Sequence, residues 1–304
     1  MRRLFPVILL VLSTGIASAN TGLETAPANM LVSFADHLFE QGDYYRAITE
    51  YKRLIFFYPD HELAKTARFQ IALSYAKGNK FDQAIQRFQA LADDLPDDAI
   101  GRRSLFMLGD TYYQKKDYPQ TIDVMQRFLS TYPTDTQGDG ARVKIGWSYL
   151  RQGDWQQASA EFRKIPADSP RRSDAEGLAE DVKAYPDIPR KSPYLAGGLS
   201  AVLPGAGQLY VERPADAAIS FLLNGLFIWA TIEAFHNDDT VAGCILLFFE
   251  SGWYLGNVYN AMNSAHKYNR RSEQSFLDHL SGQYGLTFYR DGRGINQLAF
   301  TMRF

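Results

Sequence analysis

The sequence predicts an all-α protein in which a solenoid of helical hairpins is followed by a transmembrane helical hairpin and a short C-terminal β-hairpin. Three observations lead to this prediction. Aromatic and small residues recur every 37 positions in the first half of the 304-residue chain. The segment from Pro214 to His266 contains no Lys or Arg. After Gly282, apolar residues alternate with polar or amphipathic ones, which is the period of a β-strand.

The N-terminus has the residue order of a secretory signal peptide. Arg2 and Arg3 precede an apolar run over residues 4–16, and Ala17-Ser18-Ala19 supplies the small residues of a cleavage site. We therefore expect residues 1–19 to be removed after Ala19 during export; an uncleaved anchor helix is the alternative. Asn20 follows the site in place of the Cys that a bacterial lipoprotein needs, so lipid attachment there is not expected.

Four registers with a 37-residue spacing define four repeats between about residues 29 and 167. They are Tyr44, Phe81, Tyr118 and Trp155; Ala47, Ala84, Thr121 and Ala158; Ala35, Ala72, Gly109 and Gly146; and Leu38, Tyr75, Tyr112 and Tyr149. Each repeat predicts a helical hairpin, because a small residue lets its first helix approach the second closely and an aromatic residue fills the space after the turn. A Pro follows each second helix, since Pro lacks the N–H that would continue it.

The repeat resembles the tetratricopeptide repeat in its L-G-x-x-Y element, as in Leu108 to Tyr112, and in its A-x-x-x-F element, as in Ala84 to Phe88. The unit is longer than the usual length of about 34 residues and lacks the leading Trp. This longer form is similar to repeats of bacterial envelope proteins, such as the lipoprotein subunit of the barrel-assembly machinery and periplasmic cell-division coordinators. The resemblance implies a solenoid that binds a protein or peptide, without specifying the partner.

The repeat register also predicts a partner-binding groove on the concave face, lined by the first helix of each repeat. It comprises Phe69, Leu73, Arg103, Phe106, Asp110, Tyr113, Trp147 and Arg151. A groove that mixes aromatic residues with Arg suits an extended peptide or a helix. The alternative is that some of these aromatics belong to the core between repeats. Residues 173–184 are expected to cap a solenoid domain over 29–184, and residues 185–193 to form a Pro-rich linker.

Residues 194–262 predict a membrane module. Ala215–Phe235 and Thr240–Met262 are 21 and 23 residues long, and each can cross a hydrocarbon core that needs about 20 helical residues. The apolar stretch 194–211 is broken by Pro204-Gly205, so it predicts a kinked short span or a re-entrant segment. We favour three spans, because they put Lys267 and its basic neighbours on the cytoplasmic side; two spans remain open.

The stretch "LPGAGQLY" resembles small bacterial membrane modules with a P-G-x-G-x-x-Y signature, over about residues 192–265. The resemblance implies a membrane location and no particular activity.

Two polar residues, Asn224 and Glu250, stand at similar depth in the predicted spans, where such side chains are costly. We expect them to share a hydrogen bond, and their role is either to hold the helices together or to handle a proton or an ion. Gly252 and Gly256 form a G-x-x-x-G pair that predicts close helix packing, either within the chain or in a homodimer.

Residues 263–304 predict a helix that continues to about residue 281 and then a β-hairpin. The terminal Phe304 behind alternating apolar residues also resembles the closing strand of an outer-membrane barrel.

Composition argues against several classes of function. A net charge of -2 gives no basic surface for nucleic acid. Cys244 is the only cysteine, the five His residues are scattered, and no catalytic or phosphate-binding motif occurs. No metal, cofactor or enzymatic activity is therefore expected.

These features predict a non-enzymatic scaffold of the bacterial cell envelope, tethered to the inner membrane, whose repeats bind a protein or peptide partner in the periplasm. The lipid bilayer is the second expected partner. One alternative is an accessory subunit of a membrane transport or channel complex. Another is an outer-membrane assembly factor that uses the terminal hairpin.

Overall fold

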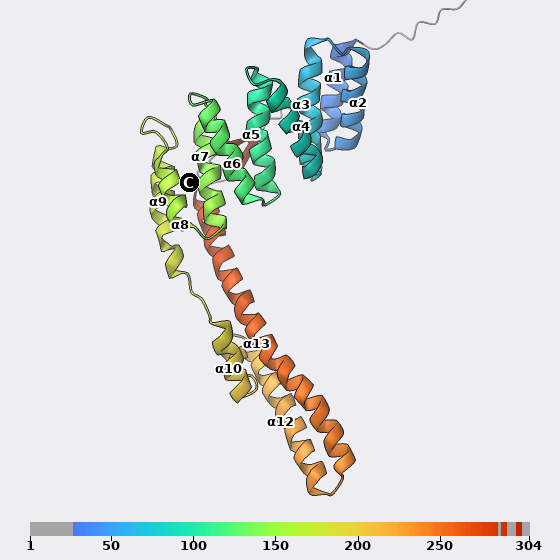
Figure 1. Ribbon diagram of the computed structural model, residues 1–304, viewed down its shortest axis with the longest axis vertical. Helices are drawn as coiled ribbons and strands as arrows, with labels where there is room; N and C mark the ends of the chain where they lie inside the picture. Colours follow the sequence, from blue (N-terminus) through green and yellow to red (C-terminus); the bar gives the residue numbers. More distant parts are fainter. Residues whose placement is uncertain (1–26, 285–286, 291–295, 300–304) are drawn as a thin grey trace, which may run out of the picture. The chain divides into compact units, whose positions relative to one another are not determined.

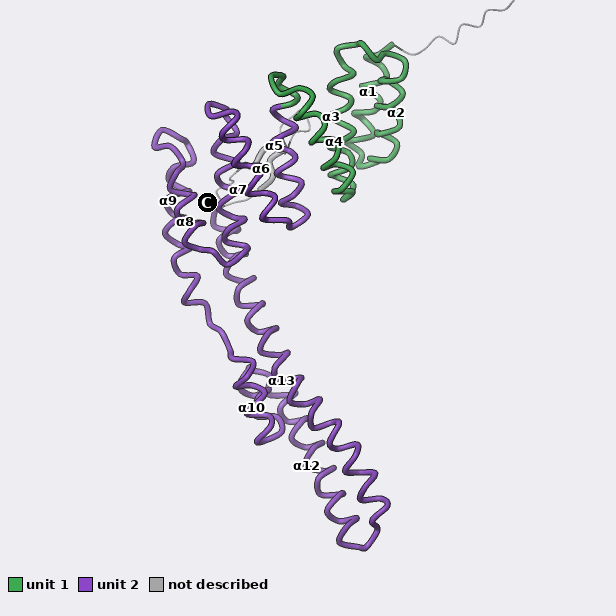
Figure 2. Tube along the Cα trace, in the orientation of Figure 1, with its two compact units in different colours: residues 1–101 green, residues 102–304 purple. Residues whose placement is uncertain are grey.

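The computed structural model describes residues 27–284, 287–290 and 296–299. The predicted signal peptide lies outside these residues. The described chain is mostly helical (Figure 1). It divides into two compact units, residues 1–101 and 102–304, which are treated separately below (Figure 2).

Four helical pairs correspond to the four predicted repeats. They are α1 (Ala28–Glu40) and α2 (Tyr44–Phe57), α3 (Glu62–Lys77) and α4 (Phe81–Asp94), α5 (Ala99–Gln114) and α6 (Tyr118–Thr131), and α7 (Gly138–Arg151) and α8 (Trp155–Arg163). The second helix of each pair begins at the aromatic residue of the 37-residue register. The repeat prediction is therefore confirmed at the level of individual helix starts.

The turn inside each pair has the same backbone conformation in all four repeats. The residue two positions before the second helix has a positive φ: 81° at Gly42, 58° at Asn79, 66° at Lys116 and 81° at Gly153. Only a few residue types adopt this left-handed conformation easily. In three turns the next residue is Asp, whose carboxylate accepts a backbone N–H three residues later and caps the helix. The repeat is thus maintained in the backbone as well as in the side chains.

The small residues of the repeat allow close helix packing, as predicted. A Cβ added to Gly146 would lie 2.3 Å from Cε1 of Phe162, and one added to Gly109 would lie 2.7 Å from Cε of Met125. These distances are shorter than any normal contact between carbon atoms, so the second helix occupies the space that a larger side chain would need.

The end of the repeat array in the second unit is covered by two short helices and by a helix from much later in the chain. Helix α9 (Arg172–Asp181) and the 3-10 helix η1 (Val182–Asp187) occupy the segment expected to form a cap. Leu178 of α9 belongs to the same core cluster as Leu277 and Leu280 of α13. The sequence had not predicted this contact.

Hydrogen bonds reinforce the contact between the cap and α13. The Tyr185 hydroxyl donates to Glu273 over 2.8 Å, and the Tyr284 hydroxyl donates to Asp181 over 2.5 Å. The two partners in each pair are 88 and 103 residues apart in sequence. The C-terminal end of α13 is therefore joined to the cap of the repeats.

The remaining helices form a separate module of the second unit. They are α10 (Pro193–Val202), α11 (Ala206–Tyr210), α12 (Pro214–His236) and α13 (Thr240–Gln283). Figure 1 shows α12 and α13 running side by side as a hairpin, with α10 against α13. Helix α13 has 44 residues and is therefore about 66 Å long, so it continues well beyond the apolar segment.

The described helices give no support to the preference for three crossings over two. Residues 194–211 fold as α10, a turn and α11, and a ten-residue helix rises only about 15 Å, half of a hydrocarbon core. Among the described helices, two are long and apolar enough to cross a membrane, α12 and α13.

Two short strands follow α13. β1 (Thr287–Arg290) pairs antiparallel with β2 (Asn296–Ala299), with Thr287 opposite Ala299 and Arg290 opposite Asn296. The intervening residues 291–295 and the terminal residues 300–304 lie outside the described part of the chain. The resemblance to a barrel-closing strand stays a prediction.

Candidate functional site

Five of the eight predicted groove residues are buried, which corrects the sequence-based interpretation. Their exposed fractions are 4% for Phe69, 2% for Leu73, 4% for Phe106, 4% for Asp110 and 0% for Trp147. A side chain without exposed surface cannot anchor a partner unless the fold opens. The alternative that these aromatics belong to the core is the correct one.

The three buried aromatics pack on the second helix of their own repeats. The ring centroids of Phe69 and Phe88 are 5.5 Å apart, those of Phe106 and Phe128 are 5.4 Å apart, and those of Trp147 and Phe162 are 6.5 Å apart. Each pair has an edge-to-face arrangement, which is the favoured geometry for aromatic rings in a core.

Asp110 forms a buried ion pair with Lys144, which is 3% exposed. The carboxylate also accepts a hydrogen bond of 2.6 Å from the Gln114 amide. The Lys144 ammonium lies 5.0 Å from the ring centre of Tyr113. Asp110 therefore has a structural role between α5 and α7.

Arg103, Tyr113 and Arg151 are half-buried and are the predicted groove residues that keep some surface. Burial raises the pKa of Tyr113, and the adjacent Arg151 opposes this by stabilising the charged form.

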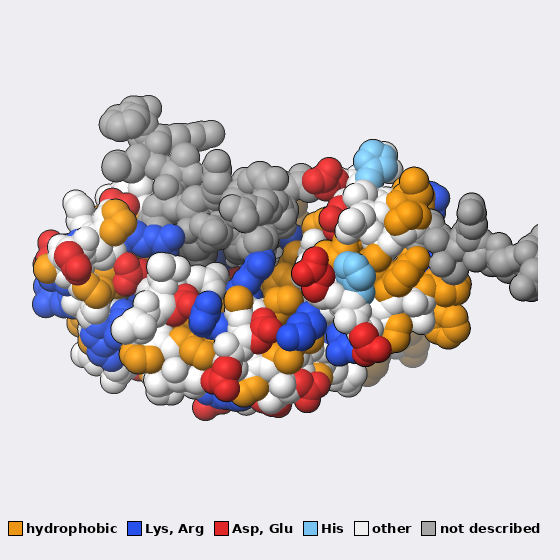
Figure 3. All heavy atoms as spheres, turned by 90° about the horizontal axis from the view of Figure 1, so that it is seen from above, with side chains coloured by type: hydrophobic (Ala, Val, Ile, Leu, Met, Phe, Trp, Pro, Cys, Tyr) orange, Lys and Arg blue, Asp and Glu red, His pale blue; other side chains and the backbone are white. Residues whose placement is uncertain are grey.

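The first helical pair presents an apolar surface that the sequence analysis missed. Tyr45 is 82% exposed and Phe56 is 79% exposed, and the Phe56 and Phe57 ring centroids are 5.2 Å apart. Met30 and Phe34 on α1 are also exposed. Figure 3 shows hydrophobic side chains gathered on an exposed face of the α1–α2 pair. These residues lie at positions where a 37-residue register alone does not distinguish an inward from an outward direction.

The P-G-x-G-x-x-Y signature forms the tight turn between α10 and α11. Gly205 has a φ of 92°, and an added Cβ would lie 2.3 Å from the carbonyl oxygen of Ala217. At Gly207 an added Cβ would lie 2.0 Å from the carbonyl oxygen of Ala196. Both positions therefore require glycine, one for conformation and space and the other for space.

A buried polar network links this turn to α13. The Ser200 hydroxyl accepts the backbone N–H of Gly207 over 3.0 Å and donates to Oε1 of Gln208 over 2.8 Å. The Gln208 amide then donates to Oδ1 of Asn257 over 2.6 Å and to the Asn257 carbonyl over 3.2 Å. The network determines how α10 and α11 pack on α13, because each buried polar atom needs its partner.

The predicted Pro-rich linker is pinned to the same module at its C-terminal end. The Lys191 backbone exchanges two hydrogen bonds with the Asn269 amide, of 2.7 and 2.9 Å. The Lys191 ammonium pairs with Glu212 at 3.1 Å and lies over the rings of Tyr210 and Tyr268. The hydrogen bond to Glu212 raises the pKa of Lys191. The Tyr of the signature thus helps to hold the linker in place.

Helices α12 and α13 carry their large apolar side chains on the outside. Only 11% of the most apolar 18-residue window of α12 is buried, and 17% of that of α13. The exposed residues include Phe221, Trp229, Phe248, Trp253 and Leu255. The core helix of a soluble protein would bury most of such a window, whereas this hairpin leaves a large apolar surface exposed.

Asn224 and Glu250 are buried within the hairpin, at 0% and 5% exposure. The predicted hydrogen bond between them is absent. The Asn224 amide donates to the Ser220 carbonyl one turn back on its own helix, over 2.6 Å. Among the described residues, neither carboxylate oxygen of Glu250 nor the side-chain oxygen of Asn224 has a hydrogen-bond partner.

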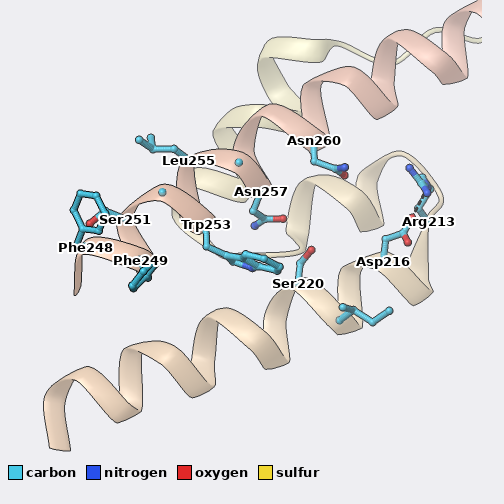
Figure 4. A pocket seen from close by; sticks show the side chains of 13 residues that line it. Arg213, Asp216, Ser220, Phe248, Phe249, Ser251, Trp253, Leu255, Asn257 and Asn260 are labelled. Carbon is cyan, nitrogen blue, oxygen red and sulfur yellow. Dashed lines mark ion pairs between the residues drawn. The ribbon is translucent and has the colours of Figure 1, made fainter. Parts of the chain in front are cut away.

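Gly252 and Gly256 do not pack against another helix of the described chain. A Cβ added to either would meet nothing within 4 Å. Both line a groove of about 730 Å³ between α12 and α13 (Figure 4). Internal packing through this pair is therefore excluded within the described chain, and the homodimer stays a prediction.

No group of three or more His, Cys, Asp or Glu residues in the described part of the chain could hold a metal ion. Its one cysteine, Cys244, is exposed and unpaired.

Comparison with known proteins bears on the repeats. One tetratricopeptide repeat model matches residues 32–99 and 69–136, and a second matches residues 141–171. These segments carry tetratricopeptide repeats. Repeats of this family are generally scaffolds for protein–protein interaction and typically non-enzymatic, and no catalytic family is indicated.

Solved structures and curated proteins add little. The TPR-like repeats of a kinesin light chain from Podosopora anserina share 9% identity, with a TM-score of 0.42 over 51% of this chain and 86% of that chain. A tetratricopeptide repeat protein from Parabacteroides merdae shares 14% identity, with a TM-score of 0.43 over 83% of this chain and 98% of that one. No curated protein matches.

Proposed function

We propose that the protein is a non-enzymatic scaffold, tethered to a membrane by α12 and α13, whose repeats bind a protein or peptide partner in the periplasm. The observation that carries the proposal is the apolar surface of the α12–α13 hairpin, which is exposed along most of both helices. Burial of apolar surface gains roughly 25 cal/mol per Å², so such a hairpin is strongly favoured in a bilayer.

The contact between the cap and the end of α13 supports a topology with an even number of membrane crossings. Asp181 and Tyr185 touch residues 273–284 directly, so both segments lie on the same side of the membrane. The chain between them then crosses an even number of times. We infer two crossings, through α12 and residues 240–262 of α13, with the loop 237–239 on the far side.

The N-terminal signal-like segment favours the periplasm for the repeats. With two crossings, the acidic loop containing Asp238 and Asp239 then faces the cytoplasm, against the positive-inside tendency. The signal-like segment and the acidic loop thus point to opposite sides of the membrane for the repeats, and we follow the signal-like segment.

Cysteine labelling tests which side of the membrane holds the repeats. In a Cys244→Ser background, a single cysteine replaces Ser173 in the cap or Asp238 in the loop, and spheroplasts are treated with a membrane-impermeant maleimide. We expect labelling at position 173, and at position 238 only after permeabilisation. The opposite pattern would place the repeats in the cytoplasm, and labelling at both positions would argue against crossing.

The exposed apolar residues of α1 and α2 support this helical pair as the partner surface. A photo-crosslinking amino acid at Phe56 should capture a protein in cells, whereas the same group at Gln126, an exposed polar position on α6, should not. Equal capture at both positions, or at neither, would contradict this surface. Phe106 and Trp147 are buried and are unsuitable for the probe.

One observation favours a second candidate, an accessory role in membrane transport. Glu250 is buried in the hairpin, and its carboxylate oxygens have no hydrogen-bond partner among the described residues. Such a residue can mark a proton or ion path. Glu250→Gln keeps the shape of the side chain, so a tether tolerates it and a conducting path does not.

A further inference from the structure

The groove between α12 and α13 has a polar end and an apolar end. Arg213, Asp216 and Asn260 line one end, and Trp253 and Phe249 line the other (Figure 4). Its volume of about 730 Å³ is in the range of pockets that hold one small ligand. Gly252 and Gly256 form part of its floor, where the absence of side chains leaves the space open.

The position of the groove along the helices matches the layers of a bilayer. With a rise of 1.5 Å per residue, Asn257 lies about 9 Å and Asn260 about 14 Å from the middle of residues 240–262. The half-thickness of a hydrocarbon core is about 15 Å. The polar end therefore lies where acyl chains join headgroups, and the aromatic end lies among the chains.

Asn257 supplies a hydrogen-bond donor that the described chain leaves unused. The side chain is 7% exposed, and its Oδ1 accepts from Gln208. The amide is therefore oriented, and its Nδ2 has no partner in the described chain. Trp253, one helical turn away, is 53% exposed, so rotation of its indole can admit an acceptor to this nitrogen.

The mouth of the groove carries one charge of each sign. The Arg213 guanidinium pairs with Asp216 and also donates to the Ser264 hydroxyl over 3.0 Å. A headgroup with a phosphate and an ammonium can contact both members of this pair. A purely anionic headgroup would be repelled by Asp216.

We propose that this groove binds a zwitterionic glycerophospholipid of the surrounding bilayer. An acyl chain lies along Trp253 and Phe249, an ester carbonyl accepts from Asn257, and the headgroup contacts Arg213 and Asp216. This inference rests on the proposed membrane insertion of the hairpin.

The test uses the full-length protein in vesicles that contain traces of phosphatidylethanolamine or phosphatidylglycerol with a photoreactive group in the acyl chain. Labelled peptides are mapped by mass spectrometry. We expect phosphatidylethanolamine to label residues 248–260 several-fold more than phosphatidylglycerol does. Asp216→Asn should reduce this preference, because it removes the negative charge at the mouth.

Two glycine variants provide a matched pair. Gly256→Leu fills the groove, whereas Gly225→Leu adds the same side chain on α12 outside it, and neither Cβ would meet another atom within 4 Å. Labelling of 248–260 should fall several-fold in the first and remain in the second. Labelling that is equal in both variants, or equal for the two lipids, would overturn the proposal.

Two further readouts separate the causes of failure. Vesicle flotation at neutral pH tests membrane insertion independently, so a protein that floats but shows no selective labelling refutes only the lipid site. Crosslinking between copies that is lost in Gly256→Leu, without lipid labelling, would mean that a second copy occupies the groove, which also overturns the proposal.

Discussion

The repeats and the hairpin use the same apolar residue types in opposite ways. In the repeats, large aromatic side chains have no exposed surface and fill the space between paired helices. They are Tyr51, Phe88, Phe128, Trp147 and Phe162. In the hairpin, side chains of equal size cover the outside, while the buried positions hold Asn224 and Glu250. The comparison teaches that hydrophobicity by itself does not locate a core. Apolar side chains that face a paired helix indicate a helix in water, whereas apolar side chains that face outward indicate an apolar environment.

Charged residues on the exposed hairpin surface should give the largest effect. Arginine at Leu226, Leu247 and Leu255 places three charges near the middle of the proposed spans, at about 2.5 to 3.5 kcal/mol each. We expect the protein to be lost from the membrane fraction. As the matched control, arginine at Tyr45 and Phe56 in the repeats should leave fractionation unchanged. Retention of the triple variant in membranes would contradict the hairpin anchor.

Breaking the buried ion pair of the repeats should give the next largest effect. Lys144→Met leaves the Asp110 carboxylate buried without its cation, and we expect a loss of about 3 to 5 kcal/mol in unfolding free energy. In the hairpin, Glu250→Gln replaces a buried carboxyl group that has no ionic partner, so a loss below about 1 kcal/mol is expected. Thermal unfolding in detergent measures both. Equal losses would show that the two buried acids have the same role.

Replacing a glycine by alanine should also affect stability differently in the two regions. Gly146→Ala places a Cβ against Phe162 and should cost about 1 to 3 kcal/mol. Gly252→Ala meets no atom within 4 Å and should change stability by less than about 0.5 kcal/mol. Denaturation in matched detergent compares them. A large loss at Gly252 would reveal a partner for that face.

The contact that joins the two regions should weaken at high pH, which is the smallest effect. Burial and the hydrogen bond to Glu273 raise the pKa of Tyr185 to about 12, and burial and Asp181 raise that of Tyr284. A raised tyrosine pKa means that the neutral form is favoured in the folded state. This contribution is complete below pH 10 and is lost as the pH rises to about 12.

Hydrogen exchange of residues 273–284 measures this loss. Protection should decrease between pH 10 and 12 after correction for the intrinsic exchange rate, and Tyr185→Phe should remove part of the pH dependence. A pH-independent contact would contradict a role for these two hydroxyl groups.

The sequence predicted the local parts of the fold. The 37-residue register located the starts of the second helices, and Gly109 and Gly146 correctly indicated close packing. It did not predict which aromatics are exposed, because Phe106 and Trp147 fit both a groove and a core in the same helical period.

The sequence analysis did not predict contacts between residues that are far apart in the chain. The preference for three membrane spans came from the distribution of charged residues along the sequence. An even number of spans is supported by the contacts of Asp181 and Tyr185 with the end of α13, which no local pattern indicates. The partner of Gln208 is 49 residues away, so no local pattern could reveal that the signature packs on Asn257. The predicted bond between Asn224 and Glu250 failed because the Asn amide binds its own helix.

Tryptophan quenching by lipids with brominated acyl chains tests the central claim most directly, because two of the four Trp residues lie in each region: Trp147 and Trp155 in the repeats, Trp229 and Trp253 in the hairpin. In vesicles, the emission of the intact protein should be strongly quenched, and the remaining emission of the Trp229→Phe, Trp253→Phe variant should not be. Equal quenching of the two proteins, or none in either, would contradict a hairpin in lipid beside repeats in water.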